Sequence, residues 1–209
     1  MEPFTEDEFM YPSADHMAKA ETDHHRRTVS DLIARLDARY ASDPNVYVSG
    51  GIKVYWETWN PYDLVVPDCF VAFGVPKRDR DKYLAWQEPA LPAVVFEVFS
   101  TESADDLPFL LHTYQKDVKV DELFLFDPFR VHEGAALAGY SRVGNELRQL
   151  EPADGGLTSR RLGVKVSIQG SKLLLLDIKT GAALLTAPER EAAALRAELG
   201  ALREIRLAR

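Results

Sequence analysis

The chain is poor in cysteine and has no long apolar run. Its single cysteine, Cys69, among 209 residues excludes an internal disulfide and a thiolate zinc cluster. No apolar run approaches the ~18 residues that a membrane-spanning helix needs, and residues 1–10 are acidic where a signal peptide is basic. We therefore expect a cytoplasmic protein without a membrane segment, with Cys69 acting as a small buried hydrophobe.

Basic charge is also scarce. The chain has 25 lysine and arginine residues against 33 aspartate and glutamate residues, for a formal net charge of −8. A protein that binds nucleic acid without sequence preference relies on a basic footprint, so this balance argues against that class. It leaves room for a metal-dependent enzyme acting on nucleic acid, because a bound divalent cation changes the local field.

The hydrophobic content of 46% is enough for a sizeable core, and its periodicity predicts a mixed α/β fold. Apolar residues at helical spacing predict a helix over 20–40, with a stripe facing the core: Val29, Leu32, Ile33, Leu36 and Tyr40. Runs rich in Val, Ile and Phe predict three strands, over 46–58, 64–73 and 93–99. The segment 76–92 is expected to be a polar loop.

A second helix and a fourth strand complete the predicted core. Ser100 or Ser103 is placed to cap a helix that carries Leu107 and Tyr114 on one stripe. The apolar segment 122–127 reads as a strand that ends before Pro128. The order is helix, three strands, helix, strand. Because a strand–helix–strand crossover gives parallel strands and short turns give antiparallel ones, we expect a mixed sheet.

The C-terminal third is expected to add strands and a helix. Residues 135–180 read as a β-rich extension of a domain spanning 20–182, and 1–19 as an irregular acidic lead. Thr186 and Glu189 form a capping box that opens an amphipathic helix over 186–209. Its narrow leucine stripe resembles a coiled-coil seam, which leaves open whether it docks on its own domain or on a second copy.

Two carboxylates interrupt the apolar strands. Asp68 follows Val65-Val66-Pro67, and Glu97 lies within the apolar strand 93–99. A buried carboxylate costs several kcal/mol unless something pairs with it. Neighbouring strands lie ~4.8 Å apart, so the two carboxylates can share one divalent cation. Asp68, Glu97 and the backbone carbonyl of Val98 would suit Mg²⁺, with Mn²⁺ as a substitute.

The order of several short motifs resembles the Uma2 family. These are bacterial proteins classed with the restriction endonucleases, in the PD-(D/E)XK nuclease superfamily. The motifs are Pro67-Asp68, Glu97-Val98-Phe99-Ser100, Asp106, Tyr114 and Phe126-Asp127-Pro128. The resemblance spans about residues 20–190 and implies a restriction-endonuclease-like core. It also implies that Asp68 and Glu97 are the catalytic, metal-binding carboxylates.

The same resemblance calls for a lysine that positions the attacking water. The superfamily places it two residues after the glutamate, where this chain has Phe99, or on the following helix, where it has Leu110. Lys53 is a candidate replacement, as are Lys116 and Lys119, although the usual place for each lysine is the solvated surface. His112 is a candidate proton carrier, or else a half-exposed helix histidine.

Three further residues are weaker candidates for supporting roles. The resemblance suggests Glu21 as a third carboxylate, but an acidic residue also stabilises the start of a helix. Ser100 and Asp106 are better explained as helix-start residues than as catalysts. His24 and His25 adjoin Glu21, but position 25 continues the apolar stripe of the first helix.

Three functions remain open. The first is a metal-dependent endonuclease that hydrolyses DNA, working as a homodimer so that two sites meet two strands. The second is a catalytically inactive nuclease fold that serves as a binding or oligomerisation module, as Phe99 and Leu110 would suggest. The third is an enzyme acting on a small phosphorylated substrate, although the chain has no glycine-rich phosphate loop.

Overall fold

The computed structural model describes Tyr11 and the ranges 22–100 and 107–207. Two of the candidate site residues, Glu21 and Asp106, lie outside the described residues. The same holds for most of the acidic lead and for the predicted start of the second helix. Everything below concerns the described ranges.

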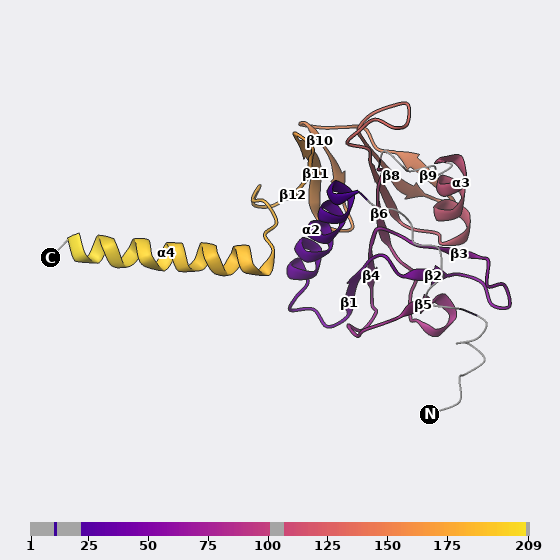
Figure 1. The fold of residues 1–209 in the computed structure, drawn as a ribbon, viewed down its shortest axis with the longest axis horizontal. Helices are drawn as coiled ribbons and strands as arrows, with labels where there is room; N and C mark the ends of the chain where they lie inside the picture. The colour runs from indigo at the N-terminus through magenta and orange to yellow at the C-terminus, as the bar shows by residue number, and fades with distance from the viewer. Residues whose placement is uncertain (1–10, 12–21, 101–106, 208–209) are drawn as a thin grey trace, which may run out of the picture.

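A six-stranded mixed sheet forms the centre of the molecule, in the order β1-β4-β6-β7-β8-β9 (Figure 1). Its strands are β1 (Val46–Ser49), β4 (Cys69–Phe73), β6 (Val94–Val98), β7 (Glu122–Phe126), β8 (Leu137–Val143) and β9 (Glu146–Gln149). β6 and β7 are parallel, and every other neighbouring pair in this sheet is antiparallel. The predicted core, with one parallel crossover in a mixed sheet, is confirmed.

Two helices cover opposite faces of this sheet. α2 (Asp23–Arg39) begins at its N-cap Thr22, whose hydroxyl oxygen accepts a hydrogen bond from the His25 backbone N–H at 3.2 Å. Its buried Leu32 and Leu36 pack on one face of the sheet, as their spacing predicts. On the other face lie α3 (Leu107–His112) and a π-helical turn, η2 (Thr113–Asp117).

The two strands predicted over 46–58 and 64–73 are each broken in the structure. The second part of 46–58 and the first part of 64–73 leave the main sheet. Together with part of the expected polar loop they form a smaller sheet, in the order β3-β2-β5. Its strands are β2 (Lys53–Tyr55), β3 (Leu64–Val65) and β5 (Lys82–Leu84), and a 3₁₀ turn, η1 (Ala85–Gln87), follows β5. The breaks fall at Gly50-Gly51 and at Pro67, because glycine tolerates a sharp bend and proline lacks an N–H for a ladder.

The predicted β-rich extension divides between two sheets. The hairpin β8–β9 adds to the edge of the core sheet through β7. A separate three-stranded sheet contains β10 (Gly156–Ser159), β11 (Val164–Gln169) and β12 (Lys172–Asp177). Buried Glu122 at the start of β7 accepts hydrogen bonds from the Ser159 hydroxyl and from the Arg160 N–H, the latter at 2.9 Å. This carboxylate therefore connects the two sheets.

The C-terminal helix, α4 (Ala187–Leu207), points away from the rest of the molecule (Figure 1). The predicted capping box is present: the Thr186 N–H donates to Glu189 at 2.8 Å, and the Glu189 N–H donates to the Thr186 hydroxyl at 3.4 Å. Within the described ranges, none of the helices has the length and apolar character required to cross a membrane.

A buried ion pair anchors the segment between β5 and β6. Arg80 donates to Glu88 through Nε at 2.7 Å and through Nη2 at 2.8 Å, and both side chains are about 5% exposed. Arg78 adds a third hydrogen bond at 2.8 Å, and the Arg80 guanidinium lies 4.2 Å from the ring centroid of Tyr47. The hydrogen bonds from Arg80 lower the pKa of Glu88 below its ordinary value.

Glu88→Gln is expected to destabilise the protein by about 3 kcal/mol at pH 7, because it leaves the Arg80 charge buried without its counter-ion. The lowered pKa of Glu88 means that its stabilisation is fully present above its ordinary value of 4.5 and is lost as the pH falls through the folded-state pKa. Urea unfolding at pH 7 and at pH 3 measures this. The two proteins should differ most at pH 7 and less at pH 3, whereas the exposed-site control Glu146→Gln should match the wild type throughout.

Candidate active site

Asp68 and Glu97 lie on neighbouring antiparallel strands. The register pairs Cys69 with Phe96, and extending it by one residue places Asp68 opposite Glu97. Directly opposite residues share one face, with their Cβ atoms about 5 Å apart. The Val98 N–H donates to Asp68 Oδ2 at 2.7 Å, which holds that carboxylate against the strand that carries Glu97. The two candidate carboxylates are thus brought together.

The backbone around Asp68 is shaped by a close approach of β1. The Gly51 N–H donates to the Pro67 carbonyl at 2.8 Å, just after β1 ends. A Cβ atom on Gly50 would lie only 1.9 Å from the Asp68 carbonyl oxygen. Only glycine fits at this crossing, so Gly50 determines where the backbone of Asp68 lies.

His25 is a site residue that sequence reasoning did not assign. Its Nε2 lies 3.1 Å from Asp68 Oδ2, and the two side chains are 9% and 20% exposed. The histidine comes from the first turn of α2, where it continues the apolar stripe as expected. A titratable side chain at an otherwise apolar position was the available signal. His25 and the Val98 N–H together hold Oδ2, and Oδ1 of Asp68 accepts no hydrogen bond from any described residue.

Tyr114 contacts the carboxylate of Glu97, as His25 contacts that of Asp68. Its hydroxyl donates a hydrogen bond to Glu97 Oε1, and both side chains are buried, with Glu97 8% exposed. Tyr114 lies in the π-helical turn η2, where the Val118 N–H donates to the Thr113 carbonyl at 3.0 Å. Such turns are frequent at functional sites because they redirect side chains of a helix.

Cys69, the residue after Asp68, is buried. Burial raises the pKa of the Cys69 thiol well above its ordinary value, and the charges of Asp68 and Glu97 raise it further. A thiol with a raised pKa is a poor nucleophile and a poor metal ligand. Cys69 therefore acts as a small core residue, as predicted.

Apolar side chains occupy the two expected lysine positions. Phe99 is buried, with its ring centroid 4.5 Å from that of His132, and Leu110 is partly buried against the α3 face of the core. The expectation that Lys53 is solvated is wrong, because this side chain is only 6% exposed in β2. Lys116 and Lys119 are exposed, as expected.

The position of Lys53 relative to Asp68 follows from the register of β2 with β3. The register of β2 with β3 pairs Val54 with Val65, so Lys53 falls opposite Val66, two residues before Asp68. Its ammonium is carried on a four-carbon stem that spans several ångströms. The register therefore brings the backbone of Lys53 to within two residues of Asp68 along the neighbouring strand.

The remaining candidates have other surroundings. His112 is exposed on α3, and Ser100 is buried two residues after the end of β6. Asp127 accepts hydrogen bonds from the N–H groups of Val131 at 2.9 Å and His132 at 2.8 Å. Asp127 therefore shapes the loop that follows β7, in line with the expected end of that strand.

The donor set fits a hard divalent cation. Among the described residues, no three His, Cys, Asp or Glu side chains converge in an arrangement suited to a metal ion. Magnesium needs only one or two carboxylates, with water and substrate phosphate completing its shell. Asp68, Glu97 and the Val98 carbonyl offer only oxygen, which suits Mg²⁺ or Mn²⁺ better than zinc.

A cleft of about 630 Å³ lies between α2 and the β11–β12 hairpin, beginning one residue from His25. Its lining is rich in basic groups and includes one carboxylate: His24, Arg26, Arg27, Arg35, Lys172 and Asp31. Arg26 and Arg35 form ion pairs with neighbouring carboxylates. Arg27 and Lys172 are exposed and form no ion pair with any described residue. The cleft lining is thus locally basic, although the net charge of the whole chain is −8.

Comparisons with known proteins agree with this fold. The model of the Uma2 family, described as "Putative restriction endonuclease", matches residues 14–171. A similar solved structure is that of "a putative nuclease belonging to DUF820 from Anabaena variabilis ATCC 29413", with 13% sequence identity and a TM-score of 0.53. That match covers 73% of this chain and 82% of the other. The comparison with curated proteins gave no match. The family match extends over most of the chain, which therefore belongs to the Uma2 family and has a nuclease-like fold.

Proposed function

We propose that this protein is a metal-dependent endonuclease that hydrolyses phosphodiester bonds in DNA. The observation that carries the proposal is the placement of Asp68 opposite Glu97 on neighbouring strands. Membership of a family described as restriction endonucleases, and a fold shared with a protein described as a nuclease, support the same reaction class.

Each side chain of the site has a distinct task. Asp68, Glu97 and the Val98 carbonyl hold the cation, and His25 and Tyr114 fix the orientation of the two carboxylates. Bound Mg²⁺ supplies Lewis-acid polarisation of the phosphate and lowers the pKa of a water. Because Asp68 Oδ2 already has two hydrogen-bond contacts, Oδ1 would be the oxygen available to bind the cation.

Lys53 takes the part of the missing lysine in this proposal. A positive charge beside the cation stabilises the negative charge that grows on the phosphate in the transition state. Phe99 and Leu110 cannot supply it, whereas Lys53 is buried and its backbone lies opposite Val66, two residues before Asp68.

In this proposal the basic cleft beside α2 contacts the DNA backbone. We expect the double substitution Arg27→Ala/Lys172→Ala to weaken duplex binding about uniformly across sequences. It should also reduce the slope of log affinity against log salt by about 2, one unit per lost phosphate contact. Fluorescence anisotropy with Ca²⁺ in place of Mg²⁺ measures binding without turnover. Arg148→Ala, at an exposed position on β9, is the matched control and should leave the slope unchanged.

Incubation of the folded protein with supercoiled plasmid and Mg²⁺ or Mn²⁺ tests the activity. The proposal expects nicked circles that require the metal, together with calorimetric Mg²⁺ binding that is lost in Asp68→Asn. Absence of Mg²⁺ and Mn²⁺ binding would overturn it at its first step.

A second candidate is a nuclease fold without turnover that acts as a binding module. Phe99 and Leu110 at the usual lysine positions favour it. This candidate predicts that the protein binds DNA but leaves plasmid intact at every metal concentration. Metal-dependent nicking would exclude it.

A further inference from the structure

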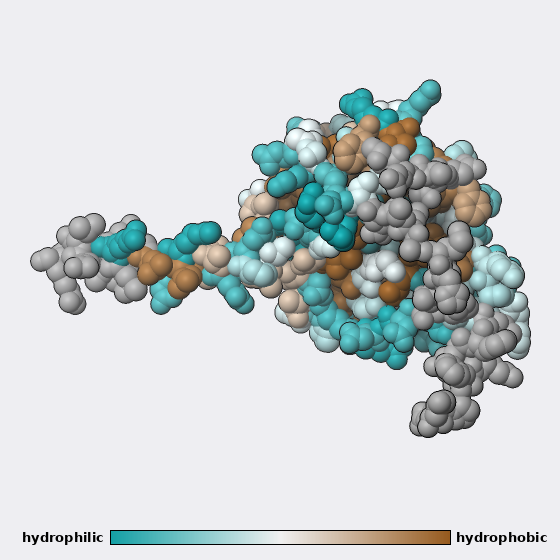
Figure 2. Space-filling view, in the orientation of Figure 1, coloured by the Kyte–Doolittle hydropathy of each residue, from teal (hydrophilic) through white to brown (hydrophobic). Residues whose placement is uncertain are grey.

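α4 carries exposed leucines on a helix that stands clear of the domain (Figures 1 and 2). Leu195 is 59% exposed and Leu199 is 49% exposed. Figure 2 shows brown apolar residues between teal polar ones along this helix. In proteins most of the stability of a helix comes from packing an apolar face. The leucine face is therefore unpartnered within the described part of the chain, and the structure does not dock it on its own domain.

Four apolar residues in the part of α4 before Arg206 have heptad spacing. Ala192, Leu195, Leu199 and Leu202 are separated by three, four and three residues, which makes Ala192 and Leu199 a positions and Leu195 and Leu202 d positions. Two such stripes pack together by inserting each side chain between four residues of the facing helix. The spacing is that of a coiled-coil seam rather than of a broad globular face.

The charged residues beside this seam indicate the partner and its direction. Glu191 and Glu198 occupy g positions, and Arg196 and Arg203 occupy e positions five residues later. In a parallel pair each g residue faces the e residue five positions on in the other helix, so every such contact joins glutamate to arginine. In an antiparallel pair g faces g and e faces e, so like charges would meet.

We propose that α4 binds α4 of a second copy of this chain as a parallel, in-register coiled coil. The proposal rests on α4 alone and does not depend on nuclease activity. It names the second copy as the occupant because the glutamate and arginine rows of one helix complement those of an identical helix.

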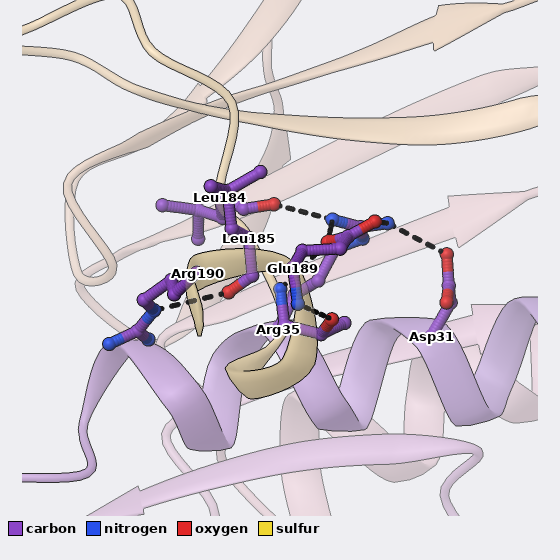
Figure 3. A network of polar contacts seen from close by, with 7 residues as sticks. Asp31, Arg35, Leu184, Leu185, Glu189 and Arg190 are labelled. Atoms are coloured by element: carbon purple, nitrogen blue, oxygen red, sulfur yellow. Dashed lines mark hydrogen bonds and ion pairs between the residues drawn. The ribbon is translucent and has the colours of Figure 1, made fainter. Parts of the chain in front are cut away.

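The start of α4 is attached firmly to the domain, so this pairing would position whole domains. Arg35 on α2 donates to both Glu189 oxygens, at 2.7 and 3.1 Å, and to the Leu184 carbonyl at 2.6 Å (Figure 3). Arg35 also bonds Asp31 at 3.1 Å. In a parallel pair both anchored ends lie at the same end of the coiled coil. The two nuclease domains would then be neighbours about a two-fold axis.

Charge reversal tests the pairing. Glu191→Arg/Glu198→Arg puts arginine at all four flanking positions, and Arg196→Glu/Arg203→Glu puts glutamate there. We expect light scattering to give about twice the 23.5 kDa chain mass for the wild type and the monomer mass for each variant alone. An equimolar mixture of the two variants should regain the dimer mass. A monomeric wild type at tens of micromolar, or dimeric variants on their own, would overturn the proposal.

Cross-linking tests the direction. Ala192→Cys, at an a position, should form an intermolecular disulfide on mild oxidation, because identical a positions face each other only in a parallel, in-register pair. Ala193→Cys, one residue away and outside the seam, is the matched control and should cross-link poorly. Native Cys69 is buried and does not interfere. A dimer in which the two variants cross-link equally would contradict the parallel arrangement.

Discussion

Glu97→Gln is expected to remove at least ~99.9% of Mg²⁺-dependent plasmid nicking and to weaken Mg²⁺ binding. The substitution keeps the shape of the side chain and an oxygen that can accept the Tyr114 hydroxyl, so the fold is preserved. It removes one of the two negative charges that would hold the cation under the proposed function. The cation contributes several kcal/mol to transition-state stabilisation, and each 1.36 kcal/mol is a factor of ten in rate.

Two comparisons make this result specific. Glu146→Gln removes an exposed carboxylate on β9 and should leave nicking and Mg²⁺ affinity unchanged. Lys53→Met should reduce nicking while leaving Mg²⁺ affinity close to that of the wild type, because Lys53 is not a ligand. The measurements are the initial rate of nicked-circle formation and calorimetric Mg²⁺ titration. Wild-type nicking by Glu97→Gln would remove this carboxylate from the mechanism.

Local patterns were sufficient to predict most elements of the core. The stripe through Leu32 and Leu36 predicts a helix that lies on the sheet, and the structure has it from Asp23 to Arg39. The apolar run around Glu97 predicts the central strand, and the crossover to β7 predicts its parallel neighbour. These features follow from side-chain periodicity over a few turns or pleats, which a single sequence contains.

Features that depend on distant pairing were less accessible. The two halves of 46–58 pair with different strands: Val46 lies opposite Phe73, and Val54 lies opposite Tyr83. The periodicity of this segment does not indicate such a division. The hairpin β8–β9 was expected in an extension, but it adds to the core sheet through β7. The alternating pattern of a strand indicates which of its side chains face the core. It does not indicate to which sheet edge the strand adds.

The candidate site likewise contains residues that the sequence pattern indicates and residues that depend on distant packing. Asp68 and Glu97 stand out in the sequence because charge is costly in an apolar strand. The partners of these carboxylates come from helices, His25 from 43 residues before Asp68 and Tyr114 from 17 residues after Glu97. Those contacts depend on how α2 and η2 pack on the sheet. The burial of Lys53 likewise depends on a second sheet that the sequence pattern did not indicate.

Gly50→Ala is expected to destabilise the protein by about 3 kcal/mol or more and to weaken Mg²⁺ binding at the same time. The new Cβ atom would lie 1.9 Å from the Asp68 carbonyl oxygen and 2.8 Å from its carbon. Both are backbone atoms, so the clash cannot be relieved by rotating a side chain, and overpacking of a tight contact costs up to ~3 kcal/mol even where side chains can shift. Urea unfolding and calorimetric Mg²⁺ titration below the unfolding transition measure the two effects.

The neighbouring glycine provides the matched control. Gly51 has a φ of +68°, and a Cβ atom there meets nothing within 4 Å. Gly51→Ala should therefore cost only the ~1–2 kcal/mol of a left-handed backbone and leave Mg²⁺ affinity intact. Equal losses of stability in the two variants would show that the close approach to Asp68 carries no special cost. A coupled loss in Gly50→Ala alone would show that one glycine determines both the strand crossing and the position of the carboxylate, because the backbone that must move is that of Asp68.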